Sequence, residues 1–117
     1  MENYKELVVW NRGMELACAA YEVALKLPRH ETYALSDQIR RSAISIPSNI
    51  AEGYGRNSTR DYVRFLSIAR GSRYELETQL LLCVKLGYVD EKGIASAVQL
   101  GTEVGKMLNV MISKLSE

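Results

Sequence analysis

Apolar residues recur at intervals of three and four along most of this chain, which is the spacing of one face of an α-helix. Pro28 ends the first such run, because the residue before a proline avoids helical geometry. Gly87 should end the third predicted helix, and Asp90 should cap the N-terminus of the fourth. The pattern therefore predicts an all-α fold with helices at about Val8–Leu27, Thr32–Tyr54, Ser58–Leu86 and Glu91–Leu115.

Each predicted helix has one stripe of residues that should face the core. On the first helix the stripe is Leu7, Trp10, Met14, Ala17, Tyr21 and Ala24, and on the second it is Leu35, Ile39, Ala43, Ile46 and Ile50. On the third it is Phe65, Ala69, Ser72, Leu76, Leu80 and Cys83, and on the fourth Ile94, Ala97, Gly101, Val104, Leu108, Met111 and Leu115. We expect Trp10 to be a core residue rather than a ligand contact, and Cys18 and Cys83 to be free buried thiols.

Pro47 lies inside the second predicted helix. It lacks a backbone donor and crowds the carbonyl four residues earlier, so the helix should bend at Ala43. Short polar side chains surround this position, and such groups can bond to backbone atoms that the helix leaves unused. We interpret Ser45, Pro47, Asn49 and Glu52 as a structural kink; the alternative is that Asn49 and Glu52 contact a ligand.

Several glycines suggest local geometry. Gly53 with Gly55 should end the second helix in left-handed geometry, and Gly71 suggests a close approach by another helix. Gly101 and Gly105 have the GxxxG spacing, which we interpret as close helix packing.

Two long motifs carry a resemblance to a known family. The run RRSAISIPSNIAEGYGR at 40–56, followed by RDYVRFLSIARGSRYELETQL at 60–80, resembles the signature of the 23S ribosomal RNA intervening-sequence proteins. The similarity extends to LVVW at 7–10, ETYALSDQ at 31–38 and LGYV at 86–89. The resemblance implies a bacterial protein with an antiparallel up-down four-helix bundle, here with a proline-kinked second helix, that forms a ring, typically a pentamer. It also suggests nucleic-acid binding.

Size and composition fit this interpretation. At 117 residues, with 47% hydrophobic and 25% charged residues, the chain is expected to form one soluble domain, 1–117. It has no uncharged stretch approaching the about 20 residues of a membrane helix. The N-terminal segment has no basic stretch leading into an apolar core, so we expect no secretory signal and a cytoplasmic location.

Basic charge is concentrated in the middle of the chain. Residues 38–75 contain seven arginines and three acidic residues, a net charge of +4, whereas the whole chain carries +1. Arginine is well suited to forked contacts with phosphate, and Tyr54 and Tyr62 could stack on bases. The candidate nucleic-acid contacts are Arg40, Arg41, Arg56, Arg60, Arg64, Arg70 and Arg73.

The alternative is a solvated face of internal ion pairs. Helical spacing would pair Asp37 with Arg41, Glu52 with Arg56, Asp61 with Arg64 and Arg73 with Glu77. This arrangement would leave mainly Arg60 and Arg70 for a ligand.

The fourth predicted helix has more apolar residues than its inward stripe needs. Contiguous exposed apolar surface usually marks an interaction site, so we expect a subunit interface that includes Val98, Leu100, Met107 and Ile112.

No residues suggest catalysis. His30 is the only histidine, which leaves no Ser/His or Cys/His pair to propose, and phosphate-loop and metalloprotease motifs are missing. We therefore expect a protein that is not an enzyme and has no cofactor and no metal site. Two hypotheses remain: a homo-oligomer that binds structured RNA through an arginine-bearing rim, and an oligomeric scaffold that binds a protein partner.

Overall fold

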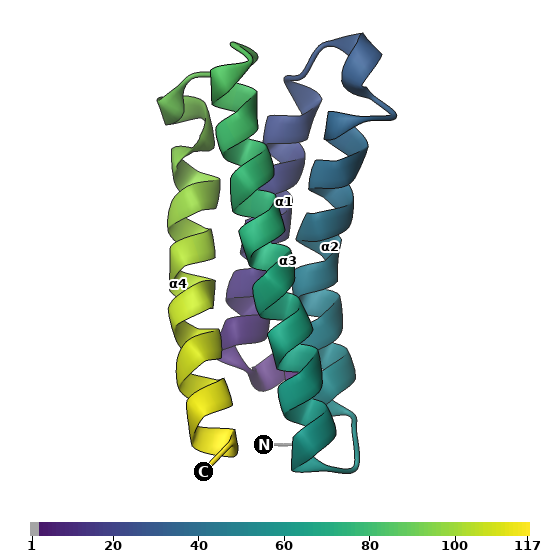
Figure 1. Cartoon of the computed structure of the whole chain (residues 1–117), viewed down its shortest axis with the longest axis vertical. Helices are drawn as coiled ribbons and strands as arrows, with labels where there is room; N and C mark the ends of the chain where they lie inside the picture. The colour runs from purple at the N-terminus through teal and green to yellow at the C-terminus, as the bar shows by residue number, and fades with distance from the viewer. Residues whose placement is uncertain (1–2) are drawn as a thin grey trace.

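Four long helices form one bundle in the computed structural model, which describes residues 3–117. Neighbouring helices run in alternating directions, and the bundle measures 43 × 23 × 20 Å (Figure 1). The elements are η1 (Tyr4–Glu6), α1 (Val8–Leu25), η2 (Arg29–Glu31), α2 (Leu35–Tyr54), α3 (Thr59–Lys85) and α4 (Glu91–Leu115). The predicted all-α fold of four helices is confirmed. The two short 3₁₀ turns η1 and η2 were not predicted.

The predicted starts of α3 and α4 are confirmed by their caps, whereas α2 starts at Leu35, later than the predicted Thr32. The Ser58 hydroxyl accepts from the Asp61 backbone N–H at 3.1 Å, and the Asp90 carboxylate accepts from that of Gly93 at 2.9 Å. Gly87, with φ of 79°, supplies the left-handed residue after α3. The expectation for the end of α2 was wrong, because Gly55 has φ of −79° and right-handed geometry.

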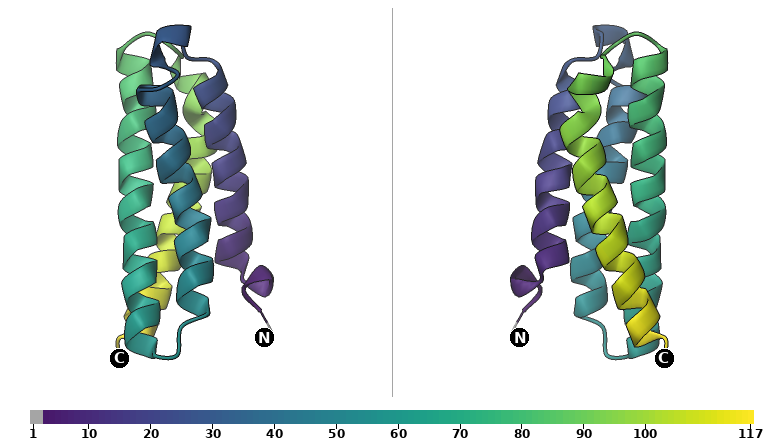
Figure 2. Two further views of the ribbon diagram at one scale, coloured as in Figure 1. Left: turned by 90° about the vertical axis from the view of Figure 1, so that its right-hand side faces the viewer. Right: turned by 90° about the vertical axis from the view of Figure 1, so that its left-hand side faces the viewer.

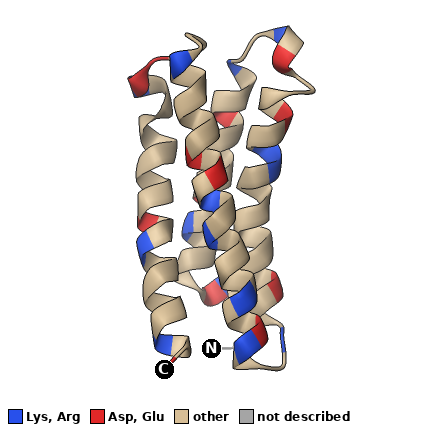
Figure 3. Ribbon diagram, viewed as in Figure 1, with Lys and Arg blue, Asp and Glu red and all other residues tan. Residues whose placement is uncertain are grey.

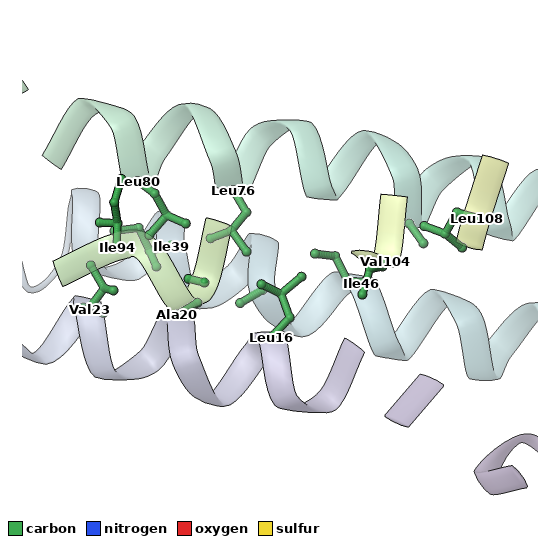
Figure 4. Close-up of a cluster of buried hydrophobic side chains, with 14 of the residues drawn as sticks. Leu16, Ala20, Val23, Ile39, Ile46, Leu76, Leu80, Ile94, Val104 and Leu108 are labelled. Carbon is green, nitrogen blue, oxygen red and sulfur yellow. The ribbon is translucent and has the colours of Figure 1, made fainter. Parts of the chain in front are cut away.

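Side chains from all four helices meet along the bundle axis (Figure 4). The stripes predicted for α2 and α4 are confirmed at their centres, from Ile39 to Ile50 and from Ile94 to Leu108. On α3 the stripe is confirmed from Ala69 to Cys83, but Leu66 is buried where Phe65 was predicted.

The stripe predicted for α1 was wrong over most of its length. The buried residues of α1 are Val9, Gly13, Leu16, Ala20, Val23 and Ala24, so of the predicted stripe only Ala24 is buried. The inner stripe packs against α2 at Gly13, where a Cβ would lie at an ordinary contact distance of 3.6 Å from side-chain atoms of Ile46 and Pro47. Trp10 is therefore only half-buried, and Cys18 is exposed, contrary to expectation. Both cysteines are free thiols, as predicted.

Helix α2 continues through Pro47, and a polar cluster links it to α3 beside the proline. The Asn49 amide donates to the Ser45 carbonyl at 2.7 Å, and the Ser45 and Ser72 hydroxyl oxygens are 2.7 Å apart. These hydrogen bonds give the polar groups of Ser45, Asn49 and Ser72 partners within the bundle. The predicted bend at Ala43 stays a prediction.

The close approach predicted at Gly71 is wrong. A Cβ at this position would meet nothing within 4 Å, because Gly71 is on the exposed side of α3.

The helices of residues 3–117 include no segment with the length and apolar character that a bilayer crossing requires.

Candidate nucleic-acid interface

The seven candidate arginines do not form one surface, because α2 and α3 carry them to three places. Arg40 and Arg41 lie on the first half of α2, and Arg70 and Arg73 lie at the middle of α3. The remaining three are around the α2–α3 turn, where Figure 3 shows basic positions gathered at one end of the bundle. We call Arg56, Arg60 and Arg64 the arginine end.

Arg73 and Arg70 tie α3 to α4. The Arg73 Nε donates to the Gly101 carbonyl at 3.0 Å, and only 14% of its side chain is exposed. A Cβ on Gly105 would lie 3.3 Å from the guanidinium, so the predicted close packing at the two glycines makes room for an arginine. Arg70 donates to the Asn109 amide oxygen at 3.1 Å.

Arg40 and Arg41 are held by their own segment. The predicted pair of Arg41 with Asp37 is present at 2.9 Å, and Arg40 donates to the Thr32 carbonyl at 2.9 Å. These bonds position both guanidinium groups near the start of α2, away from the arginine end.

The arginine end includes one paired and two unpaired guanidinium groups. Arg56 pairs with Glu52 at 2.8 Å, and its guanidinium lies 4.7 Å from the centre of the Phe65 ring. Arg60 and Arg64 are exposed, one turn apart on α3, and nothing within residues 3–117 forms an ion pair with either. The pair predicted between Asp61 and Arg64 is therefore not formed.

Aromatic side chains support this end from inside. Tyr54 and Tyr62 pack edge to face, with ring centres 6.2 Å apart, and both are half-buried. Burial raises the pKa of the Tyr62 hydroxyl above its ordinary value. Gly53 packs directly against α3 at this end, because an added Cβ would lie only 2.8 Å from the Phe65 Cβ and 3.0 Å from the Tyr62 ring. The role of the two tyrosines as stacking surfaces stays a prediction.

The structure does not place the four candidate interface residues of α4 on one face. All four are half-buried against the core. Val98 lies among α3 residues such as Arg73, whereas Leu100 and Met107 lie on the side that faces α1.

Two exposed apolar grooves flank α1 instead. The α1–α2 groove, about 660 Å³, is lined by Tyr4, Trp10, Met14, Ala17, Cys18, Tyr21, Ile44, Pro47, Ser48 and Ala51. The α1–α4 groove, about 470 Å³, is lined by Leu7, Val8, Val9, Lys106, Met107, Val110 and Met111. Sequence reasoning missed the first groove because it assigned the outer stripe of α1 to the core.

A polar cluster joins the two connections at the other end of the bundle. The Tyr88 hydroxyl donates to the Glu31 carboxylate at 2.7 Å and lies 3.2 Å from the His30 Nε2. The other Glu31 oxygen accepts from the Leu35 backbone N–H at 3.2 Å, at the start of α2. The Tyr88 hydrogen bond, followed by that of Leu35, lowers the pKa of Glu31. The spacing along the sequence gave no signal for this cluster.

Among residues 3–117, no three His, Cys, Asp or Glu side chains come together as a metal site would require.

The fold places this chain in the class of small all-α four-helix-bundle proteins, and the comparisons with known proteins identify the family. The chain belongs to the 23S rRNA-intervening sequence protein family, which it matches over residues 5–110. It is similar to a crystal structure of a protein of unknown function from the S23 ribosomal protein family of Bacteroides thetaiotaomicron. The TM-score is 0.83 at 29% identity, over 90% of this chain and 98% of that one. No curated protein matches the chain.

Proposed function

We propose that this protein is a non-enzymatic homo-oligomer, a pentamer as the resemblance implies, that binds structured RNA through the arginine end. The observation that carries the proposal is the pair of exposed guanidinium groups of Arg60 and Arg64, which no acid within residues 3–117 neutralises. Arg56 lies beside them and could exchange Glu52 for phosphate. The proposal takes the protein to act in the bacterial cytoplasm, the location expected from its sequence.

Assembly would make a weak site useful. Three arginines and their acidic neighbours Glu52 and Asp61 give one copy only a small positive charge. In a ring with cyclic symmetry, every copy would present its α2–α3 turn on the same rim. Contacts with phosphate would then add across copies without any single contact being strong.

Binding to a structured RNA hairpin, measured at increasing salt with protein freed of nucleic acid, tests this proposal. We expect affinity to fall steeply between about 50 and about 200 mM salt. The double variant Arg60→Gln, Arg64→Gln should bind more weakly, with a salt slope reduced by about 1 for each lost arginine that contacts phosphate.

The matched control is Arg29→Gln, Arg41→Gln, which removes the same charge from two exposed arginines at the other end of the bundle. This control should retain the binding and the slope of the unmodified chain. Equal loss in both double variants, or no salt-dependent binding by the unmodified chain, would reject the RNA proposal.

The alternative function is an oligomeric scaffold for a protein partner, and the exposed α1–α2 groove favours it. An apolar contact responds little to salt, whereas phosphate binding responds steeply. A partner whose binding is unaffected by Arg60→Gln, Arg64→Gln and insensitive to salt would support the scaffold.

A further inference from the structure

Helices α3 and α4 have an uneven distribution of charge along their length. Residues 60–74 of α3 and 104–114 of α4 contain four arginines and two lysines but a single acidic residue, Asp61. Residues 75–103, between these two stretches, contain five acidic residues and two lysines. Helix α4 ends beside the start of α3, so the two basic stretches adjoin each other next to the arginine end (Figure 2). Figure 3 shows the same change along α3, from basic to acidic positions.

A line of residues runs along the outer side of α3 through its basic stretch. Arg60 and Tyr74 are 14 positions apart, which is close to four helical turns, so they lie on the same side of the helix. Arg64 lies one turn after Arg60, and Arg70 lies one turn before Tyr74. Arg70 donates to the amide oxygen of Asn109, which is neutral, and neither Arg64 nor Arg70 forms an ion pair within residues 3–117. We call Arg60, Arg64, Arg70 and Tyr74 the α3 track.

Tyr74 presents an aromatic ring at one end of the α3 track. It is 53% exposed, and the guanidinium of Arg73 lies 5.2 Å from the centre of its ring. Arg73 is itself fixed between α3 and α4 by its bond to the Gly101 carbonyl. The ring is therefore supported from the protein side and open to solvent. Sites for single-stranded nucleic acids combine such rings, on which bases stack, with basic side chains that follow the backbone.

The length of the α3 track matches a short single strand. Arg60 and Tyr74 are about 21 Å apart along the helix axis. A strand with stacked bases advances about 3.4 Å per nucleotide, so about six nucleotides cover this distance. Glu75 and Glu77 follow Tyr74 directly, and their charge opposes phosphate beyond the ring.

We propose that the α3 track binds a single-stranded RNA segment next to the hairpin held by the arginine end. The phosphates of this segment contact Arg64 and Arg70, and one of its bases stacks on Tyr74. This inference rests on the proposed function and extends its site from the α2–α3 turn to the middle of α3. The apolar grooves beside α1 suit a polyanion less well, because the residues that line the larger one are uncharged.

Three RNA probes test the α3 track. They are a blunt hairpin, the same hairpin with six unpaired adenosines, and the same hairpin with six abasic units in their place. Each tail is attached in turn at the 5′ and the 3′ end. For the unmodified chain, we expect the adenosine tail at one end to bind more tightly than the abasic tail. The abasic tail should in turn bind more tightly than the blunt hairpin, because its phosphates alone contact arginine.

Tyr74→Ala removes the stacking surface. It should weaken binding of the adenosine-tailed hairpin by about fivefold or more, the loss expected for one stacked base. Binding of the blunt and the abasic-tailed hairpins should be unchanged. Circular dichroism should show unchanged helix content, because Tyr74 is exposed.

Two controls isolate the ring. Tyr74→Phe retains the aromatic ring and should retain the affinity for the adenosine tail. Tyr33→Ala removes a ring that is 94% exposed near the start of α2, away from the arginine end, and should affect none of the probes.

The outcomes separate this inference from the proposed function. If the adenosine tail adds no affinity, or if Tyr74→Ala weakens all three probes equally, the α3 track is overturned and hairpin binding by the arginine end stands. If the adenosine and abasic tails add the same affinity, stacking on Tyr74 is overturned. If the unmodified chain binds none of the probes, both proposals fail.

Discussion

At the scale of single residues, Glu31 shows how one carboxylate can hold two connections together. One of its oxygens accepts from Tyr88 in the α3–α4 turn, and the other accepts from the backbone N–H of Leu35 at the start of α2. Both bonds favour the ionised carboxylate, which is why the pKa of Glu31 is lowered. The contribution to folding is therefore present above the ordinary glutamate pKa and is lost as pH falls through the lowered value.

Tyr88→Phe removes the larger of these two hydrogen bonds. We expect the pKa of Glu31 to rise towards its ordinary value, as measured by NMR titration of the carboxyl carbon. Denaturation should show a loss of stability at neutral pH that disappears as pH falls through the lowered pKa of Glu31, because the carboxyl is then protonated in both folded and unfolded chains. An unchanged pKa in the variant would contradict this account of the cluster.

Sequence patterns predicted single residues well where the signal was local. The caps at Ser58 and Asp90 and the left-handed Gly87 depend on neighbours along the chain. Glu31 and Tyr88 are 57 positions apart, so only the fold brings them together.

At the scale of helices, α2 and α3 pack closely because Gly53 lacks a side chain. A Cβ there would lie 2.8 Å from the Phe65 Cβ, and neither atom can move without shifting its helix. The arginine end depends on this contact, since Phe65 supports the Arg56 guanidinium.

Gly53→Ala should therefore destabilise the protein by about 1–3 kcal/mol, the usual range for overpacking. Gly71→Ala is the matched control in α3, where a Cβ meets nothing within 4 Å, and it should stabilise by about 0.5–1 kcal/mol. Urea denaturation of both variants gives the comparison. Equal effects of the two substitutions would argue against the close contact.

The helices also show where sequence reasoning failed. On α1 the outer stripe has larger apolar residues than the inner one, so periodicity alone favoured the wrong side. The inner stripe is buried although it includes residues as small as Gly13 and Ala20, so the size of the apolar residues does not reveal it. Likewise, Arg73 was predicted to contact phosphate because it is an arginine. In the structure its side chain packs between α3 and α4, where Gly101 and Gly105 leave room for it.

At the scale of the whole molecule, the fold was predictable and most of the candidate site was not. Four amphipathic runs and two long motifs predicted the bundle. The distribution of seven arginines over three places depends on where α2 and α3 run, which spacing cannot tell. The folded chain exposes two kinds of surface that the spacing did not predict: three arginines at one end, and two apolar grooves beside α1.

Self-association is the central claim of the proposed function, because a ring would bring the arginine ends of several copies onto one rim. The mass of the purified protein by light scattering on a sizing column tests this directly. We predict five times the 13.2 kDa of one chain, the subunit number that the resemblance implies. A mass of one or two chains, unchanged as concentration rises, would contradict the account.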